Sequence, residues 1–371
     1  MPGDRTERSH VRIVALIPAH QEQDSVGRTV EALLHQDRMP DLTVVIVDNC
    51  TDATYERAVQ AADGHPSVIV VRTVANANRK PGALNWAWNR YCQDADLLVT
   101  LDADTCLPPN AVSDWEQEFE ADPCLAGSSS KFTMPAVPGG GGNLLIRLQR
   151  AEFASWTMTG LRRGWTSVLA GTACAIRNSV LKEVAARGDR VGPWSYHSDV
   201  EDFELTYRIR QLGYRCQISP TVRAYTDAMP TVRALWGQRM KWQAGTCQDL
   251  ARFGFNRLTA PDWRQQAAGM LAALARIAWL TFVLAASSLG VLHLTPIWLL
   301  PMAAFIATDT RQSLLIPHRD RWDVLMALVL VPQEIFAWLR AGWFLASWWQ
   351  VLTGQTKDRW ALQYRAELQR G

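Results

Sequence analysis

The stretch VRIVALIPA, at residues 11–19, decides the fold class of this chain. It is a short apolar run that ends in Pro-Ala, which is typical of a buried strand. Apolar residues then recur at helical spacing between residues 22 and 36. Further short apolar runs, again separated by helical patterns, occupy residues 43–47, 68–71 and 97–101. Strands that alternate with helices predict an α/β domain with a mostly parallel sheet and right-handed crossovers.

Polar residues follow each of the predicted strands. In such sheets the carboxyl ends of the strands bind ligands, so these positions are the first to consider for a functional site. They are His20, Gln21 and Glu22 after the first strand, a turn that begins at Asp48 after the second, Lys80 and Gly82 after the third, and Asp102 and Asp104 after the fourth.

The pair Asp102 and Asp104 predicts how a nucleotide phosphate is held. No Gly-x-Gly-x-x-Gly follows the first strand and no Gly-Lys-Ser/Thr occurs, so the dinucleotide fingerprint and the phosphate loop are both absent from the sequence. Two carboxylates at i, i+2 after a strand can present oxygen ligands to Mg²⁺ or Mn²⁺, which then bridges a diphosphate. Lys80 is available to the same phosphates. An ordinary turn is the alternative for a lone Asp-x-Asp.

Hydropathy divides the chain near residue 265. The apolar run at residues 267–292 contains one charge, Arg276, and is about long enough to cross a bilayer. The run at 295–308 is short for a crossing. The run at 324–352 contains a group of tryptophans that is typical of a membrane interface. The alternative is a buried helical core of a soluble protein.

Basic residues give an expectation for the membrane topology. The link at 311–321 and the tail at 357–370 are both basic, and the positive-inside tendency puts both on the cytosolic side. Three simple crossings cannot satisfy this arrangement. We therefore expect residues 324–352 to be a bent hairpin or partly interfacial.

Composition excludes several other classes of protein. The formal net charge of the 371 residues is +2, so a general nucleic-acid binder is not indicated. The seven cysteines include no Cys-x-x-Cys pair, which argues against a zinc site and a disulfide framework and fits a reducing, cytosolic face. The polar N-terminus has no signal-peptide pattern. We expect a cytoplasmic catalytic domain attached to the cell membrane.

An acidic stretch, SDVEDFELTYRI at residues 198–209, begins an amphipathic helix that Gly213 ends. Carboxylates in a first helical turn are stabilised by unpaired N–H groups and by the helix dipole. The alternative to a catalytic role for Glu201 and Asp202 is therefore an N-terminal cap.

In order, these motifs resemble those of the membrane-bound, family-2-type glycosyltransferases of the nucleotide-diphospho-sugar (GT-A, Rossmann-like) fold. The resemblance is to the poly-N-acetylglucosamine, hyaluronan, chitin and cellulose synthases, and it covers most of the chain. Each motif is weak alone, but seven in the family's order, followed by apolar runs, are a strong signal. The matching segments are Pro18-Ala19-x-x-Glu22, Asp48 to Thr54, Lys80-Pro-Gly82-Ala-Leu-Asn85, Asp102-Ala-Asp104, Gly171-Thr172 to Arg177, Val200-Glu201-Asp202, and Gln238-Arg239-Met240-Lys241-Trp242.

The resemblance implies an inverting transfer of a sugar from a nucleotide-sugar donor to an acceptor hydroxyl. Asp202 would be the catalytic base, with Glu201 shaping the site, and Asp104 and Asp102 would hold Mg²⁺ or Mn²⁺. The implied donor-binding residues are Pro18, Ala19, Glu22, Asp48, Lys80, Asp102, Gln238, Arg239 and Lys241, and the implied acceptor-side residues are Trp242, Gly171, Thr172 and Trp194.

Several of these residues have structural alternatives. Asp48 could serve only its turn, and Lys80 could be a solvated loop residue. Trp242 could anchor the chain at a membrane interface, and Trp194 could simply pack. Lys241 departs from the family's usual Arg and lacks its bidentate fork, which puts the holding of the diphosphate, and processivity, in doubt.

The resemblance also implies partners: a UDP-sugar donor, with UDP-N-acetylglucosamine the first guess, a glycan or lipid acceptor, and membrane lipid. A single-transfer enzyme acting on a lipid or other hydrophobic acceptor is the first alternative to a polysaccharide synthase. A membrane-tethered nucleotide-sugar binding subunit without chemistry is the second, although it would predict a damaged set of acids.

The expected organisation has four parts: a GT-A catalytic domain at 1–235, a closure motif with interfacial helices at 236–266, membrane helices at 267–352 and a basic tail at 353–371. Residues 144–165 predict a basic amphipathic helix that lies on a membrane or packs on the catalytic domain. The four glycines at 139–142 predict a flexible loop.

Overall fold

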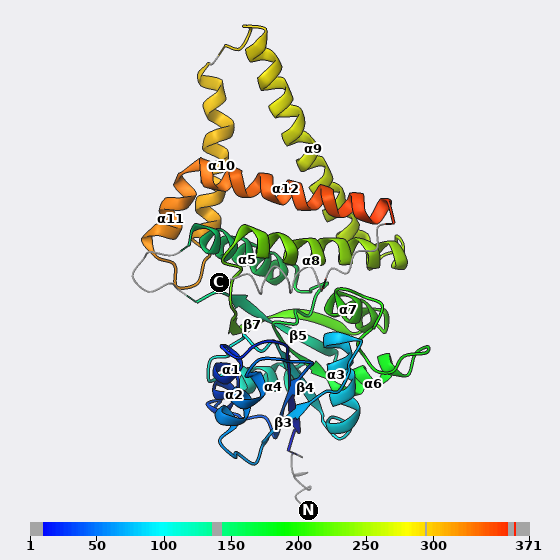
Figure 1. Ribbon diagram of the computed structural model, residues 1–371. Coiled ribbons are helices and arrows are strands. Elements are labelled where there is room, and N and C mark those ends of the chain that lie inside the picture. Colours follow the sequence, from blue (N-terminus) through cyan, green and yellow to red (C-terminus); the bar gives the residue numbers. More distant parts are fainter. Residues whose placement is uncertain (1–9, 136–142, 294, 355–359, 361–371) are drawn as a thin grey trace, which may run out of the picture. The chain divides into compact units, whose positions relative to one another are not determined.

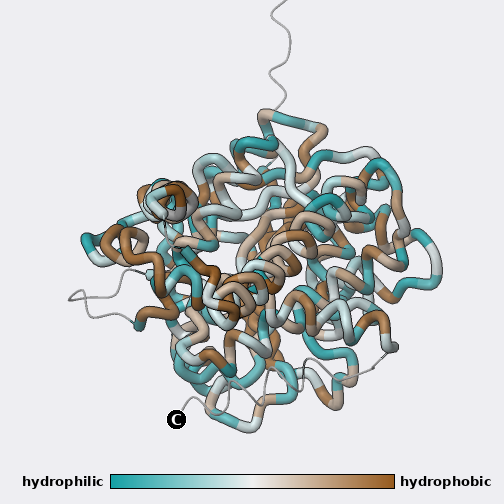
Figure 2. Tube along the Cα trace, turned by 90° about the horizontal axis from the view of Figure 1, so that it is seen from above, coloured by the Kyte–Doolittle hydropathy of each residue, from teal (hydrophilic) through white to brown (hydrophobic). Residues whose placement is uncertain are grey.

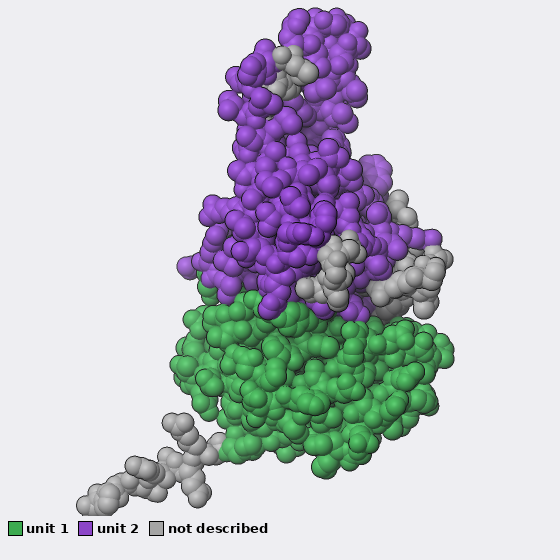
Figure 3. Space-filling model, turned by 90° about the vertical axis from the view of Figure 1, so that its left-hand side faces the viewer, with its two compact units in different colours: residues 1–132, 163–196, 201–226 green, residues 133–162, 197–200, 227–371 purple. Residues whose placement is uncertain are grey.

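The computed structural model describes residues 10–135, 143–293, 295–354 and 360. The chain forms two compact units, which Figure 3 shows in two colours. Unit 1 consists of Met1–Phe132, Arg163–Tyr196 and Glu201–Thr226, and unit 2 of Thr133–Arg162, His197–Val200 and Asp227–Gly371. The expected glycine loop, and nearly all of the expected basic tail, lie outside the described residues. The domain boundaries expected from hydropathy remain predictions.

Unit 1 is built on a seven-stranded sheet with the strand order β3-β2-β1-β4-β6-β5-β7 (Figure 1). β1 pairs in parallel with β2 and β4, and β2 with β3, which confirms the expected α/β class and its parallel strands. β6 runs antiparallel to both β4 and β5. The strands are β1 Ile13–Ala19, β2 Leu42–Val47, β3 Val68–Arg72, β4 Leu97–Leu101, β5 Leu125–Thr133, β6 Ala173–Arg177 and β7 Arg215–Tyr225.

Helices cover both faces of this sheet because the strands are apolar on both sides. Ile13 and Ile17 of β1 pack in a core with residues of α1, α2 and α4. Val14 and Leu16, which point to the opposite face, pack with α3, α6 and α7. The helices of unit 1 are α1 Val26–Leu34, α2 Thr54–Ala62, α3 Arg79–Tyr91, α4 Ala111–Ala121, α6 Asn178–Ala185 and α7 Glu201–Gln211.

The acidic stretch does begin a helix. α7 has Glu201, Asp202 and Glu204 in its first turn, and its apolar residues Leu205 and Ile209 are buried against the sheet. Gly213 follows the helix with a φ of 93°, a left-handed conformation that glycine adopts without strain. The amphipathic pattern therefore fixes which face of α7 is buried, and its carboxylates are left at its amino end.

Unit 2 consists mainly of helices. α5, α8 and α12 enclose a small apolar core that includes Leu148, Leu235, Phe336 and Trp343. The expected helix at 144–165 is present as α5, but its first half is buried within unit 2. The elements are α5 Leu144–Arg163, α8 Val232–Phe253, α9 Ala260–Ser288, the 3₁₀ helix η2 Pro296–Trp298, α10 Leu299–Ser313, α11 Arg321–Leu328 and α12 Leu330–Leu352.

The three apolar runs form helices of different kinds. Within the described residues, α9 alone is long and apolar enough to cross a membrane as a single helix. α11 and α12 pass the same test only as a pair, and they meet at a bend of 80°. Figure 2 colours the Cα trace by the hydropathy of each residue. The bend agrees with the expectation that residues 324–352 are not one straight crossing.

Candidate active site

The candidate site lies at one edge of the unit 1 sheet. β1, β2 and β4 are parallel, so the residues after them gather at the same edge. β6 is antiparallel to β4, which brings the residues before β6 to that edge as well. The Asp102 N–H donates a hydrogen bond of 3.1 Å to the carbonyl of Thr172. Two motifs that are 70 residues apart are joined in this way.

Lys80 is the central cation of this edge. Its Nζ donates a short hydrogen bond to Asp102 Oδ1 and lies 3.7 Å from Glu201 Oε1. Burial alone would lower the pKa of Lys80, but the charges of Asp102 and Glu201 outweigh it and raise the pKa above its usual value. Lys80 is therefore a permanent cation held by carboxylates, and not the solvated loop lysine that was the alternative.

Gly171 makes room for Lys80. A Cβ added at Gly171 would lie 2.6 Å from Lys80 Nζ, closer than any ordinary contact. The Gly171 N–H also donates a hydrogen bond of 3.3 Å to Asp202 Oδ2. Glycine at this position thus permits the approach of the lysine and supports the carboxylate of Asp202. The resemblance had assigned Gly171 to the acceptor side.

Asp202 lies at the amino end of α7, beside Lys80. Its carboxylate lines a pocket together with Lys80, Gly171, Glu201 and Trp194. Its Oδ1 accepts from the backbone N–H of Phe203 at 2.8 Å, so the helix terminus stabilises the negative charge. The capping and the catalytic interpretations of this residue are therefore compatible.

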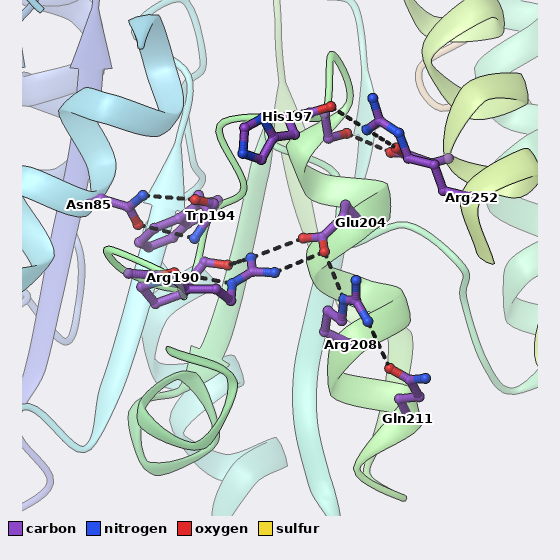
Figure 4. Close-up of polar contacts among 12 residues, drawn as sticks. Asn85, Arg190, Trp194, His197, Glu204, Arg208, Gln211 and Arg252 are labelled. Atoms are coloured by element: carbon purple, nitrogen blue, oxygen red, sulfur yellow. Dashed lines mark hydrogen bonds and ion pairs between the residues drawn. The ribbon is translucent and has the colours of Figure 1, made fainter. Parts of the chain in front are cut away.

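Glu204, the third acid of this turn, has a structural role. It accepts hydrogen bonds from Arg190 at 2.9 and 3.0 Å and from Arg208 at 2.8 Å (Figure 4). These contacts occupy both of its oxygens with arginine side chains. The structure thus separates Glu204 from its two neighbours, Glu201 and Asp202.

Trp194 is almost fully buried and lines the same pocket. The side chain of Asn85 holds its backbone from both sides: Nδ2 donates to the Trp194 carbonyl at 2.8 Å and Oδ1 accepts from its N–H at 3.1 Å (Figure 4). Gly192 leaves the space that Asn85 needs, because a Cβ there would lie 2.4 Å from Asn85 Oδ1. Trp194 thus packs in the core and also lines the pocket.

Asp48 follows β2 and is held by residues after β3. Its Oδ1 accepts from Thr73 Oγ1 at 2.5 Å and from Asn76 Nδ2 at 2.8 Å. Gly82 leaves room for Asn76, since a Cβ at Gly82 would lie 2.1 Å from Asn76 Oδ1. The side chain of Asp48 is therefore fixed by neighbouring loops, which an isolated turn residue would not need.

The Pro18-Ala19-x-x-Glu22 motif contributes mainly to local structure. Pro18 lines the pocket, and Ala19 accepts a backbone hydrogen bond from Asp48 at 2.8 Å. The carboxylate of Glu22 accepts from Ser25 Oγ at 2.5 Å, just before α1, and its N–H donates to Thr54 Oγ1 at 2.8 Å. A contact of Glu22 with a donor stays a prediction.

Asp102 and Asp104 have the right donor atoms for a divalent metal. Asp104 Oδ1 accepts from Thr226 Oγ1 at 3.2 Å and from Thr105 Oγ1 at 3.3 Å, so this carboxylate is oriented by hydroxyl groups. No cluster of three or more His, Cys, Asp or Glu suited to a metal occurs among the described residues. This set fits Mg²⁺ or Mn²⁺, which bind through one or two carboxylates together with substrate phosphates.

The Gln-Arg-Met-Lys-Trp motif lies on α8, in unit 2. Arg239 is only 3% exposed, and its guanidinium donates to Glu152 of α5 at 2.8 Å. The rings of Phe153, Trp156 and Trp242 surround it with centroids 5.2, 5.1 and 4.5 Å from its Cζ. In this conformation Arg239 serves the packing of α5 on α8. Its contact with the donor remains a prediction.

Gln238 and Lys241 also lie in unit 2, where Gln238 is half-buried and Lys241 is buried. Gln238 Oε1 is buried and has no hydrogen-bond partner in the part of the chain that the structure describes. Lys241 Nζ lies 3.4 Å from the centroid of the Trp360 ring, a cation–π contact. Their closing over a donor, like the stacking of Trp242 on an acceptor, remains a prediction.

Sequence reasoning missed the residues that orient the site. Thr73 fixes Asp48, and Asn85 fixes Trp194, yet neither was given a function. Asn85 stood at the end of a matched motif, so a signal existed for it. Thr73 is a single hydroxyl after a strand, and only the register of β2 and β3 places it beside Asp48.

Comparison with known proteins identifies the family of this chain. A family model described as glycosyltransferase-like family 2 matches residues 11–245. The poly-β-1,6-N-acetyl-D-glucosamine synthase of Staphylococcus aureus is 24% identical over 248 residues, 66% of this chain and 57% of that protein. The β-monoglucosyldiacylglycerol synthase of Synechocystis is 26% identical over 254 residues, 67% of this chain and 50% of that protein.

The chain thus spans about half the length of these relatives. A solved structure supports the fold: the mannosyltransferase PcManGT from Pyrobaculum calidifontis, in complex with GDP-Man and Mn²⁺, superposes with a TM-score of 0.65 at 18% identity. The match covers 94% of this chain and 89% of that one. The family model covers more than half of the chain and includes every unit 1 motif described above. The chain belongs to the glycosyltransferase-like family 2.

Proposed function

We propose that this chain transfers a sugar, with inversion, from a UDP-sugar to a hydroxyl of an acceptor held at a membrane. The observation that carries the proposal is the group of Lys80, Asp102, Glu201 and Asp202 around one pocket at the sheet edge. Family membership supports a nucleotide-sugar donor, and UDP-N-acetylglucosamine is our first choice because of the resemblance to poly-N-acetylglucosamine synthases.

The proposed chemistry needs a base, an electrophile and a stabilised leaving group. The acceptor hydroxyl gives its proton to the carboxylate of Asp202, and its oxygen forms a bond to the anomeric carbon from the face opposite the leaving group. The bond from that carbon to the diphosphate oxygen breaks, and the nucleoside diphosphate leaves. Gly171 supports Asp202 through its N–H, so the carboxylate is held in place before the reaction.

Lys80 stabilises the charge of the leaving diphosphate in this scheme. Its partners Asp102 and Glu201 keep it protonated and fix its position. A divalent metal bound by Asp102 and Asp104 would act as a Lewis acid on the same diphosphate. Asp48, fixed by Thr73 and Asn76, has its second carboxylate oxygen for an N–H of the nucleotide base.

The test measures UDP release from UDP-N-acetylglucosamine and related UDP-sugars with Mg²⁺ or Mn²⁺. Asp202→Asn is expected to lower the rate about 10²- to 10⁴-fold, because general-base catalysis contributes on that order. Asp104→Asn is expected to lose the dependence on the metal concentration. Asp114→Asn, on α4 and bonded only to Asn110 in the described contacts, is the matched control and keeps the wild-type rate. If Asp202→Asn and Asp104→Asn both left UDP release intact, the proposal would be wrong.

A second candidate is transfer of a single sugar to a lipid acceptor. Lys241, which stands where the family usually has Arg, favours it, and a relative named for monoglucosyldiacylglycerol synthesis supports it. Incubation with a labelled UDP-sugar separates the two functions. A ladder of long products would exclude the single-transfer alternative, and one product with one added sugar would exclude a polysaccharide synthase.

A further inference from the structure

The loop before α11 is tied to α5 by buried ion pairs, and this tie restricts the path of the chain through a membrane. Arg147 of α5 donates to Asp320 at 2.6 and 2.9 Å and to Asp323 at 2.9 Å. Arg150 donates to Asp323 at 2.8 Å. α5 comes before every apolar run, so both ends of the α9–α10 segment lie on the α5 side. The α9–α10 segment must therefore leave the α5 side and return to it.

The returning segment has an apolar surface with charges at its base. Leu274, Trp279 and Phe282 of α9 and Phe305 of α10 are exposed, as are most of their apolar neighbours. Exposed apolar helices of this kind fit hydrocarbon rather than water.

The charges form a cluster at one level, which we call the collar: Arg276 of α9, Asp309 of α10, and Glu334 and Arg340 of α12. Arg276 donates to Glu334 Oε1 at 3.2 Å, and Asp309 lies within electrostatic reach of the other three. The two side chains of the ion pair are 27% and 35% exposed, so the pair opens on the apolar surface. Charged groups this near to lipid are tolerated close to the headgroups and are costly in the centre of the hydrocarbon.

α12 has a second apolar face that nothing in the described residues covers. Phe336 and Trp343 pack into the core with α5 and α8, whereas Val331, Ile335 and Trp338 form an exposed stripe at helical spacing. α12 packs against α9 and α10 and crosses between their lower ends (Figure 1). A helix with one face on protein and an apolar face outward sits in the plane of an interface, roughly 5–10 Å deep.

The lengths of these elements match the thickness of one bilayer. From Arg276 to the end of α9 at Ser288 the helix rises roughly 18 Å, and the turn beyond it adds a few more. The returning arm, from Pro296 to Asp309, rises roughly 21 Å. With a collar roughly 5–10 Å below the near surface, the hairpin tip reaches the far side of a hydrocarbon core of about 30 Å. A non-helical tip that stopped inside the core would leave backbone groups unpaired.

We propose that α9 and α10 cross one bilayer as a helical hairpin, with the tip near Val291 on the far side and α12 lying in the plane of the near interface. The lipid bilayer is thus the partner of the α12 stripe, and residues 324–352 do not form a third crossing. If α12 instead crossed the bilayer, Phe336 and Trp343 would have to leave the apolar core that they form with α5 and α8. The hairpin returns the basic residues around position 319 to the near side, which satisfies the positive-inside tendency.

The test labels single introduced cysteines with a membrane-impermeant maleimide. Val291→Cys, at the exposed tip, is expected to react from outside in sealed spheroplasts, to a large fraction of the extent reached after detergent solubilisation. Leu352→Cys, at the exposed end of α12, is expected to raise labelling in inverted vesicles above that of the wild-type chain, which has the exposed Cys124, and to add none from outside. Cys124, an exposed native cysteine of unit 1, is the internal control: it reacts in inverted vesicles, and its silence from outside proves that the spheroplasts are sealed.

Two results would overturn the proposal. One is a tip cysteine that reacts only in detergent, which indicates a hairpin embedded in one leaflet. The other is Leu352→Cys reacting from outside, which indicates that α12 crosses. If Val291→Cys does not accumulate, His293→Cys gives the same reading at the tip. The proposal rests on the proposed membrane attachment but not on the chemistry, so UDP release by the solubilised protein is scored separately.

Discussion

Ion pairs of the same chemistry serve different purposes in the two units. In unit 1, Lys80 meets Asp102 and Glu201 at the rim of a pocket, and the side chain of Asp102 is 35% exposed. In unit 2, Arg147 and Arg150 meet Asp320 and Asp323, and Asp323 and Arg150 are almost fully enclosed. The first set can exchange a partner for a ligand. The second set cannot do so without leaving a buried charge unpaired.

This difference distinguishes a functional cluster of charges from a structural one. A functional set keeps access to solvent and one side that faces a pocket, whereas a structural set saturates its oxygens and N–H groups with protein. Arg150, for example, also donates to the carbonyls of Pro317 and His318, at 3.0 and 3.2 Å. Substitutions in the two sets should therefore affect different quantities.

The largest expected effect is on the stability of unit 2. Arg150→Met leaves Asp323 buried with one cation fewer, and breaking a buried pair in this way costs about 3–5 kcal/mol. Thermal unfolding in detergent measures the loss. Arg208→Met is the matched control, because Arg208 is half-exposed and Glu204 keeps its ion pair with Arg190, so the loss of stability should be smaller. Equal shifts for the two variants would contradict the distinction.

The next effect is on catalysis. Lys80→Met removes the cation proposed to stabilise the leaving diphosphate, and the rate of UDP release should fall about 10²- to 10³-fold. The variant should lose less stability than Arg150→Met, since the nearer carboxylate, Asp102, is 35% exposed and regains water, whereas Glu201 stays buried. A rate within a few fold of the wild type would place Lys80 among the structural residues instead.

Much of unit 1 was predictable from the sequence because its information is local. Four apolar runs gave the parallel strands, and their ends gave Asp48, Lys80, Asp102 and Asp104. The resemblance singled out Asp202, but nothing local gave Glu204 its structural role, because its partner Arg190 comes from a loop. Likewise, nothing local shows that Arg147 and Arg150 meet acids more than 160 residues away. Sequence periodicity reports which face is buried, and it does not report long-range partners.

A smaller catalytic effect is expected from Gly171→Ala. The added methyl group would lie 2.6 Å from Lys80 Nζ, and the flexible end of the lysine must move by a few tenths of an ångström or more. Misplacement of this kind should cost about 10-fold in the rate of UDP release, with an upper bound of about 10². Gly27→Ala, on α1, is the matched control, because an added Cβ there would meet only Ala61 Cβ, at an ordinary distance of 3.8 Å. A wild-type rate for Gly171→Ala would show that the close approach to Lys80 is not needed.

The smallest effect concerns the pH dependence of unit 2. The hydrogen bonds from Arg147 lower the pKa of Asp320 to about 2, against the opposing effect of burial, from an ordinary value near 3.8. A carboxyl whose pKa is lower in the folded state stabilises that state fully above its unfolded pKa, and the contribution is lost as the pH falls from about 4 towards 2. Asp320→Asn should therefore be less stable than the wild type by about 1 kcal/mol near neutral pH, after allowance for screening. Asparagine still caps the start of α11 as Asp320 does, so the change isolates the charge. Thermal unfolding of both proteins between pH 6 and pH 3 should show the gap narrowing as the pH falls. A gap that stayed constant over this range would mean that the Asp320 carboxylate contributes through its shape and hydrogen bonds, and that the ion pair with Arg147 adds no stability.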